Sequence, residues 1–146
     1  MRKFEVVKKE FIKYGVAPQK LPQRATKNSA GYDIYSPIDI VIEPKKMEMI
    51  WTNVKAQFNA DEVLLLCVTS GIMLANTLGV IDCDYYGNQS NDGNLGIRLY
   101  NFSDAPYVVK AGDKIAQGMF VKYLTVDNEP EITTTRVGGF GSTVKK

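Results

Sequence analysis

Residues 54–68 read VKAQFNADEVLLLCV and contain two apolar runs, Val54–Phe58 and Val63–Val68, on either side of the turn-forming residues Asn59-Ala60-Asp61. Each run has the usual length of a β-strand and is too short for an amphipathic helix. Apolar runs bounded by Asn and Asp in this way are typical of strands. This stretch therefore predicts two β-strands separated by a turn.

The same pattern extends over the rest of the chain, where ten further runs are bounded by Gly, Pro, Asn, Asp or Ser. No window keeps a 3.6-residue apolar period for the length that a helix needs. We therefore predict an all-β fold, a β-sandwich or barrel. The further expected strands are Phe4–Val7, Tyr32–Tyr35, Ile38–Ile42, Met47–Thr52, Ile72–Ala75, Val80–Ile81, Gly96–Phe102, Tyr107–Val109, Lys114–Tyr123 and Glu131–Thr134.

Length and composition predict one domain over residues 1–146, since domains usually have about 100–200 residues. The formal net charge of +2 lacks the strong basic excess of a non-specific nucleic-acid binder. No apolar run approaches the roughly 20 residues of a membrane span. We therefore expect a cytoplasmic protein with neither nucleic acid nor membrane as a partner.

The residue types narrow the possible chemistry. The sequence has no histidine, which excludes a Ser-His-Asp or Cys-His nucleophile and a His-liganded zinc site. Its two cysteines, Cys67 and Cys83, could form a disulfide, but two reduced thiols in apolar strands are the favoured interpretation. General acids and bases must therefore be carboxylates, tyrosines or lysines.

Residues 79–88, GVIDCDYYGN, carry the clearest catalytic pattern. Strand alternation would place Asp82 and Asp84 on one face, with Tyr85 opposite or on the turn. Two neighbouring carboxylates repel each other, so a structure that keeps them usually offers a cation, a proton or a water. A carboxylate that holds a water suits hydrolysis. The alternative is an ordinary β-hairpin whose Asp and Asn residues make the turn.

Three other segments suggest anion or metal chemistry. In SAGYDIYS (29–36), Asp33 is either a carboxylate aimed at a cation or water, or a turn cap. In AGDKIAQG (111–118), Gln117 can donate to a phosphate or lie on the surface. In TRVGGFGST (135–143), glycine amides and Arg136 can wrap a polyphosphate while Phe140 stacks on a base. The alternative for this last segment is a frayed tail.

Taken in order, these four segments resemble four of the five motifs of the homotrimeric dUTP diphosphatase (dUTPase) family. The resemblance implies a jelly-roll-like β-barrel or sandwich, assembled as a trimer whose active sites draw on more than one subunit. It also implies hydrolysis of dUTP to dUMP and pyrophosphate, with Mg²⁺ held by the triphosphate. A second interpretation remains open, in which the chain is a catalytically impaired relative that binds nucleotide or a protein in a regulatory role.

The resemblance also implies residue roles. Asp82 would orient the attacking water, and Tyr85 would lie against the deoxyribose and exclude a 2′-hydroxyl. Asp33 would bind metal-coordinated water, with no residue binding the metal directly. The uracil edge would be read by the backbone between Gly79 and Gly96, with Asn76 nearby. Gln117 would contact the phosphates. A glycine-rich lid over residues 136–146 would close over the bound nucleotide with Arg136, Phe140, Ser142 and Thr143.

One motif departs from the family pattern. The family has an Arg-Ser pair after a strand and then a longer stretch with a short helix, whereas this chain has only Thr69-Ser70-Gly71 before Ile72. The length of this connector predicts a tight three-residue hairpin. Ser70 and Gly71 would keep part of the phosphate contact. By analogy with a lost oxyanion donor, the missing arginine would cost about 10²–10³ in rate.

Overall fold

The computed structural model describes residues 1–69, 71–74 and 79–139. These residues form eleven β-strands and two single-turn 3₁₀ helices, with no α-helix among them, and neither helical turn could cross a membrane. The all-β prediction is confirmed. The elements are β1 (Lys3–Val6), η1 (Lys9–Phe11), β2 (Tyr32–Tyr35), β3 (Ile40–Ile42), β4 (Met47–Trp51), β5 (Val54–Gln57), β6 (Glu62–Cys67), β7 (Met73–Leu74), β8 (Gly79–Ile81), η2 (Cys83–Tyr85), β9 (Gly96–Tyr100), β10 (Tyr107–Val109) and β11 (Lys114–Lys122).

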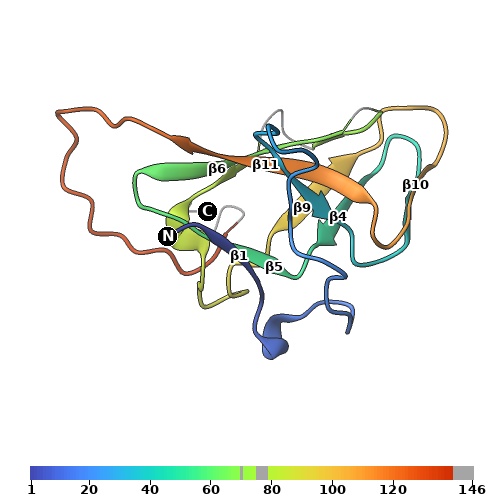
Figure 1. Ribbon diagram of the computed structural model, residues 1–146, viewed down its shortest axis with the longest axis horizontal. Helices are drawn as coiled ribbons and strands as arrows, with labels where there is room; N and C mark the ends of the chain where they lie inside the picture. The colour runs from blue at the N-terminus through green and yellow to red at the C-terminus, as the bar shows by residue number, and fades with distance from the viewer. Residues whose placement is uncertain (70, 75–78, 140–146) are drawn as a thin grey trace.

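The strands pair antiparallel in small sheets that pack as a sandwich. The largest sheet has the order β2-β11-β6-β8, and a three-stranded sheet has the order β4-β9-β7. Two further pairs are β1 with β5 and β10 with β3. In Figure 1, β11 and β6 run along one side of the molecule, and β1 and β5 lie next to each other on the opposite side. The described strands form no closed barrel.

Strand β6 shows why the chain is extended here. Leu64 and Leu66 are buried, while the residues that alternate with them, Val63, Leu65 and Cys67, are only half-buried. This alternation is that of a strand with one face on the core. Burying each large aliphatic side chain contributes about 1.5–3 kcal/mol. The core residues with 0% exposure are Ile34, Ile42, Ile50, Leu64, Leu95, Ile97, Leu99 and Ala116.

Two expectations about strands are wrong. Glu131–Thr134 is not a strand, because the segment that follows β11 leaves the sheet as an exposed arc (Figure 1). The strands that flank residues 69–71 do not form a tight hairpin either, since β6 pairs with β11 and β8 whereas β7 pairs with β9. Gly71 has a φ of +89°, and Ile72 is buried, so the chain turns into the other sheet instead of folding back.

Candidate active site

The turn after β8 brings two carboxylates to one guanidinium. β8 ends at Ile81, and Asp82 precedes the 3₁₀ turn, so strand alternation does not extend to Asp84 as expected. The two carboxylates nevertheless share a partner. Nη2 of Arg136 donates to Oδ2 of Asp82 at 2.8 Å, and its Nε donates to Oδ1 of Asp84 at 2.6 Å. Arg136 is therefore the cation that the paired carboxylates predicted.

These contacts also affect ionisation. The hydrogen bond to Asp84, together with the negative charges of Asp84 and Asp82, raises the pKa of Arg136 above its usual value although partial burial opposes this. Burial, aided by the same two charges, raises the pKa of the Cys83 thiol. Cys83 is therefore a neutral thiol at neutral pH, and the carboxylates and the guanidinium carry the charge of this turn.

The C-terminal segment docks on the connection that follows this turn. The Val137 carbonyl accepts hydrogen bonds from the backbone N–H of Ser90 at 3.2 Å and from the Ser90 hydroxyl at 2.8 Å. Gly139 lies against the Tyr85 ring, because a Cβ at this position would be 2.4 Å from Cε2 of Tyr85. Only glycine allows so close an approach. The described end of the tail therefore has a defined place next to Asp82 and is not frayed.

Tyr85 is held from several sides. Its hydroxyl donates to the Asn94 carbonyl and accepts a hydrogen bond from Nδ2 of Asn91 at 2.8 Å. Burial raises the pKa of Tyr85 to about 12, although the hydrogen bond from Asn91 and the charge of Arg136 lower it in part. The phenol is therefore neutral over the physiological range. A neutral phenol of this kind offers an aromatic ring and does not act as a base at physiological pH.

A second group forms where β2 lies beside β11. Asp33 and Gln117 are register partners across the two strands, and Nζ of Lys114 lies 3.3 Å from Oδ2 of Asp33. Gly31 leaves room for the amide, since a Cβ there would be 2.4 Å from Oε1 of Gln117. Asp33 lies inside β2 and is not a turn cap. The first and third sequence segments thus meet in one carboxylate, amide and ammonium group.

The sequence did not predict Lys114. Strand alternation would place it and Gln117 on opposite faces of β11, but the register with β2 shifts between Lys114 and Ala116. Such a bulge changes the direction in which side chains point. Ser90 was also missed, since a serine among the turn-forming residues 89–93 carries no specific signal.

Close packing explains why Gly79 and Gly96, two of the predicted site residues, are glycines. A Cβ at Gly79 would be 2.9 Å from Cβ of Leu66, and one at Gly96 would be 2.8 Å from Sδ of Met49 and from Cζ3 of Trp51. The expected β-hairpin between these glycines is wrong, because β8 belongs to the sheet of β6 and β9 to the sheet of β4 and β7. Residues 82–95 instead connect the two sheets.

The other predicted positions are divided between the surface and the part of the chain that is not described. Gly71 is exposed, and a Cβ at this position would lie in ordinary van der Waals contact with Cε2 of Tyr107, at 3.9 Å. Five predicted substrate contacts lie outside the described residues: Ser70, Asn76, Phe140, Ser142 and Thr143. Within residues 1–69, 71–74 and 79–139, no three acidic or cysteine side chains gather in a way that could hold a metal ion.

The two groups lie far apart within one chain. Asp33 is on β2 and Asp82 follows β8, and these are the two edge strands of the four-stranded sheet. With neighbouring strands about 4.8 Å apart, three strand intervals separate them by about 14 Å. A ligand that contacts both groups of one chain therefore has to span this distance.

Comparison with known proteins supplies the family. The dUTPase family model matches residues 17–144. The chain belongs to the dUTPase family. It is 39% identical over 150 residues to the deoxyuridine 5'-triphosphate nucleotidohydrolase of Lactococcus lactis subsp. lactis (strain IL1403), with 98% of this chain and 97% of the relative covered. The crystal structure of the dUTPase from Streptococcus mutans matches with a TM-score of 0.74 and 33% identity, over 86% of this chain and 98% of that one.

A more distant structure shares the fold. It is a mutant dUTPase from phage phi11 of S. aureus, whose structure reveals details of the coordination of a structural Mg(II) ion. The match has a TM-score of 0.65 and 24% identity, over 92% of this chain and 96% of that one. The jelly-roll-like β-fold expected of a dUTPase is thereby confirmed. In this dUTPase, β6 and β7, the strands before and after Thr69-Ser70-Gly71, belong to different sheets.

Proposed function

We propose that this chain is a dUTP diphosphatase, a hydrolase of nucleotide metabolism that converts dUTP to dUMP and pyrophosphate. Family membership and the relatives named as deoxyuridine 5'-triphosphate nucleotidohydrolases support this activity. The observation that carries it is the turn after β8, where Asp82, Tyr85 and the tail residue Arg136 come together. The turn offers a carboxylate for water, a ring for the sugar and a guanidinium for phosphate.

Asp82 is the residue that activates water. Its side chain is 55% exposed although Arg136 binds one of its oxygens, so water and substrate can reach it. The carboxylate orients a water for in-line attack on the α-phosphorus and accepts its proton. The bond to the β-phosphate oxygen breaks, and pyrophosphate leaves. When the triphosphate enters, its oxygens replace Asp82 and Asp84 as partners of Arg136.

Nucleoside recognition depends on shape and on backbone groups. Tyr85 lies against the deoxyribose and leaves no room for a 2′-hydroxyl. The backbone between Gly79 and Gly96, with Asn76, forms hydrogen bonds with the edge of uracil. Cytosine would leave some of these fixed donors and acceptors unpaired, so it binds less well. Phe140 stacks on the base.

The phosphates require several neutralising contacts, because the triphosphate carries close to four negative charges. Gln117, Arg136, Ser142 and Thr143 contact the phosphates, with part of the second-motif contact kept by Ser70 and Gly71. Mg²⁺ bound to the triphosphate would neutralise part of its charge. Asp33 is a hard oxygen donor of the kind that Mg²⁺ prefers, so it suits a contact through metal-bound water.

The functional unit is a homotrimer of single-domain chains, with residues 136–146 as a lid on each site. The separation of Asp33 from Asp82 on opposite sheet edges supports sites that are shared between subunits. Cys67 and Cys83 are free thiols, which supports a location in the reducing cytoplasm.

The test is pyrophosphate release from dUTP with Mg²⁺, measured beside dTTP, dCTP and UTP and with Asp82→Asn as the matched variant. We expect the wild type to release pyrophosphate from dUTP alone. We expect Asp82→Asn to bind nucleotide but to lose a factor of at least about 10³ in kcat. Turnover that survives in Asp82→Asn would remove this carboxylate from the mechanism. Calorimetric binding of dUTP without release by the wild type would mean that the chain is a nucleotide-binding protein and not an enzyme.

A further inference from the structure

A buried ion pair lies directly behind the Tyr85 turn and takes no part in the proposed chemistry. Nζ of Lys55 on β5 is 2.8 Å from Oδ2 of Asp92, and the two side chains are only 8% and 2% exposed. The proposed contacts with dUTP include neither side chain. Burial alone would raise the pKa of Asp92, but the hydrogen bonds from Lys55 and from the Lys8 amide outweigh it and lower the pKa. Asp92 is therefore charged at neutral pH.

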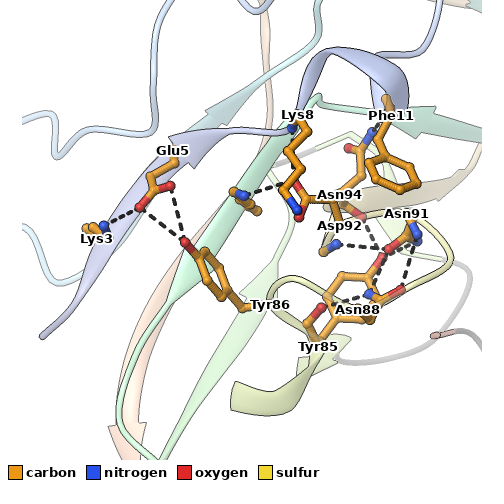
Figure 2. A network of polar contacts seen from close by, with 12 residues as sticks. Lys3, Glu5, Lys8, Phe11, Tyr85, Tyr86, Asn88, Asn91, Asp92 and Asn94 are labelled. Carbon is orange, nitrogen blue, oxygen red and sulfur yellow. Dashed lines mark hydrogen bonds and ion pairs between the residues drawn. The ribbon is translucent and has the colours of Figure 1, made fainter. Parts of the chain in front are cut away.

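One carboxylate oxygen joins three distant parts of the chain. Oδ2 of Asp92 accepts both the Lys55 ammonium and the backbone N–H of Lys8, the latter at 2.8 Å. Lys8 follows β1, Lys55 lies on β5, and Asp92 belongs to the connection between β8 and β9. Figure 2 shows Asp92 beneath the segment that carries Lys8, with Tyr85, Asn88 and Asn91 gathered on its other side.

The backbone at Asp92 closes the connection on itself. Its carbonyl accepts from the Gly87 amide at 3.1 Å, and its N–H donates to the Asn88 carbonyl at 3.0 Å. Asp92 has a φ of +60°, a left-handed conformation that is uncommon for a residue other than glycine. Surrounding contacts must hold such a conformation in place. The bonds from Lys8 and Lys55 are such contacts.

Tyr85 receives its position from the residues on either side of Asp92. Asn91 donates to the Tyr85 hydroxyl, and the Asn94 carbonyl accepts from it. The ammonium of Lys55 also lies 4.8 Å from the centre of the Tyr86 ring, whose hydroxyl donates to Glu5. Loss of the ion pair would therefore loosen both tyrosines of the turn.

We infer that the Lys55–Asp92 pair is a specificity-determining positioning device, which fixes the Tyr85 ring so that the site accepts a deoxyribose and rejects a ribose. The inference rests on the proposed function for the role of Tyr85. Neither residue touches the nucleotide, and both act through the connection between β8 and β9. A loosened Tyr85 makes room for a 2′-hydroxyl, so the first property to fall is discrimination and not turnover.

The test uses the full-length protein and two ligands that are not hydrolysed, dUMP and UMP, with dissociation constants measured by calorimetry. The double variant Lys55→Met/Asp92→Asn removes both charges and leaves no buried charge unpaired. Its preference for dUMP over UMP is expected to fall about tenfold. Asp92→Asn alone leaves the buried Lys55 ammonium without its counter-charge, so its preference is expected to fall at least as far as that of the double variant. Ile42→Val, a buried change on β3, is the control for lost stability and should leave the preference unchanged.

A second readout separates a positioning role from a structural one. Hydrogen exchange of the amides in residues 85–94, without nucleotide, should speed up at least about tenfold in the double variant and not in Ile42→Val. An unchanged dUMP preference in the folded double variant would overturn the inference, as would a wild type that does not prefer dUMP. Absence of pyrophosphate release by the wild type would overturn the proposed activity alone, because neither the binding ratio nor the exchange rate depends on turnover.

Discussion

At the residue scale, the charged side chains of the candidate site already have partners in the absence of substrate. Arg136 pairs with both Asp82 and Asp84, Lys114 pairs with Asp33, and Lys55 lies against Asp92. The first two arrangements are partly exposed, so a triphosphate can compete for the cations. The third is buried and cannot be exchanged. The exposed pairs thus suit binding, and the buried pair suits positioning.

The ion pair of Asp92 predicts how stability responds to acid. The folded protein lowers the pKa of Asp92 below its usual value of 3.8, so its charged form stabilises the fold above about pH 4. This contribution is lost as the pH falls through the folded pKa. The wild type should therefore unfold at higher urea than Asp92→Asn at pH 7, and the difference should shrink steadily between pH 4 and pH 2.

The matched control for this experiment is Asp61→Asn. Asp61 is an exposed carboxylate 3.6 Å from Lys122, and exposed pairs contribute only about 0–1 kcal/mol. Its replacement should change the free energy of unfolding at pH 7 much less than Asp92→Asn does. A difference between wild type and Asp92→Asn that stays constant from pH 7 to pH 2 would contradict the assignment.

At the element scale, the segment after β11 combines an exposed arc with a docked end. Leu124, Val126 and Ile132 are 97%, 65% and 68% exposed, whereas Arg136 and Gly138 are largely covered. Few contacts tie the arc to the sandwich, so the docked end can leave and return without disturbing the core. This is the behaviour that a lid over a nucleotide requires.

The contact between Gly139 and Tyr85 allows the proposed lid to be tested by adding one methyl group at position 139. Gly139→Ala places a Cβ 2.4 Å from Cε2 of Tyr85, so the tail must move away from the ring. We expect dUTP to bind about tenfold more weakly, with the melting temperature nearly unchanged because the tail moves while the buried Tyr85 keeps its place in the core. Val137→Ala, an exposed change two residues earlier, should bind dUTP as the wild type does. Equal affinity of Gly139→Ala and wild type would show that this contact plays no part in closure.

At the scale of the whole molecule, the position of the two charged groups predicts the assembly. Asp33 and Asp82 stand at opposite edges of one sheet, as expected if a second chain completes the proposed site. Sedimentation should give three times the chain mass, and dilution should lower the specific activity. A stable, active monomer would contradict the shared site.

Mixing two inactive variants tests whether a site is shared between chains. Asp82→Asn lacks the water-activating carboxylate, and a chain shortened to residues 1–135 lacks the lid. If the carboxylate and the tail of one site come from different subunits, co-refolded mixtures should regain part of the dUTP turnover. Mixtures as inactive as the two parents would mean that each tail closes on its own Asp82.

Local sequence was enough to predict the all-β class, most strand positions and the family. Apolar runs such as Val63–Val68 and turn residues such as Asn59-Ala60-Asp61 lie within a few positions of each other, and their signals do not depend on the rest of the chain. The absence of histidine likewise limits the possible general acids and bases to carboxylates, tyrosines and lysines, because it is a property of the sequence alone.

Only the tertiary structure decided which strands pair and which charges meet. β7 joins β9 and not β6, because the buried Ile72 and the turn at Gly71 direct the chain into the other sheet. Arg136 is 52 residues from Asp84, and Lys55 is 37 residues from Asp92, so no local pattern connects them. Contacts of this kind form where folding buries distant segments against each other, and burial depends on the whole core.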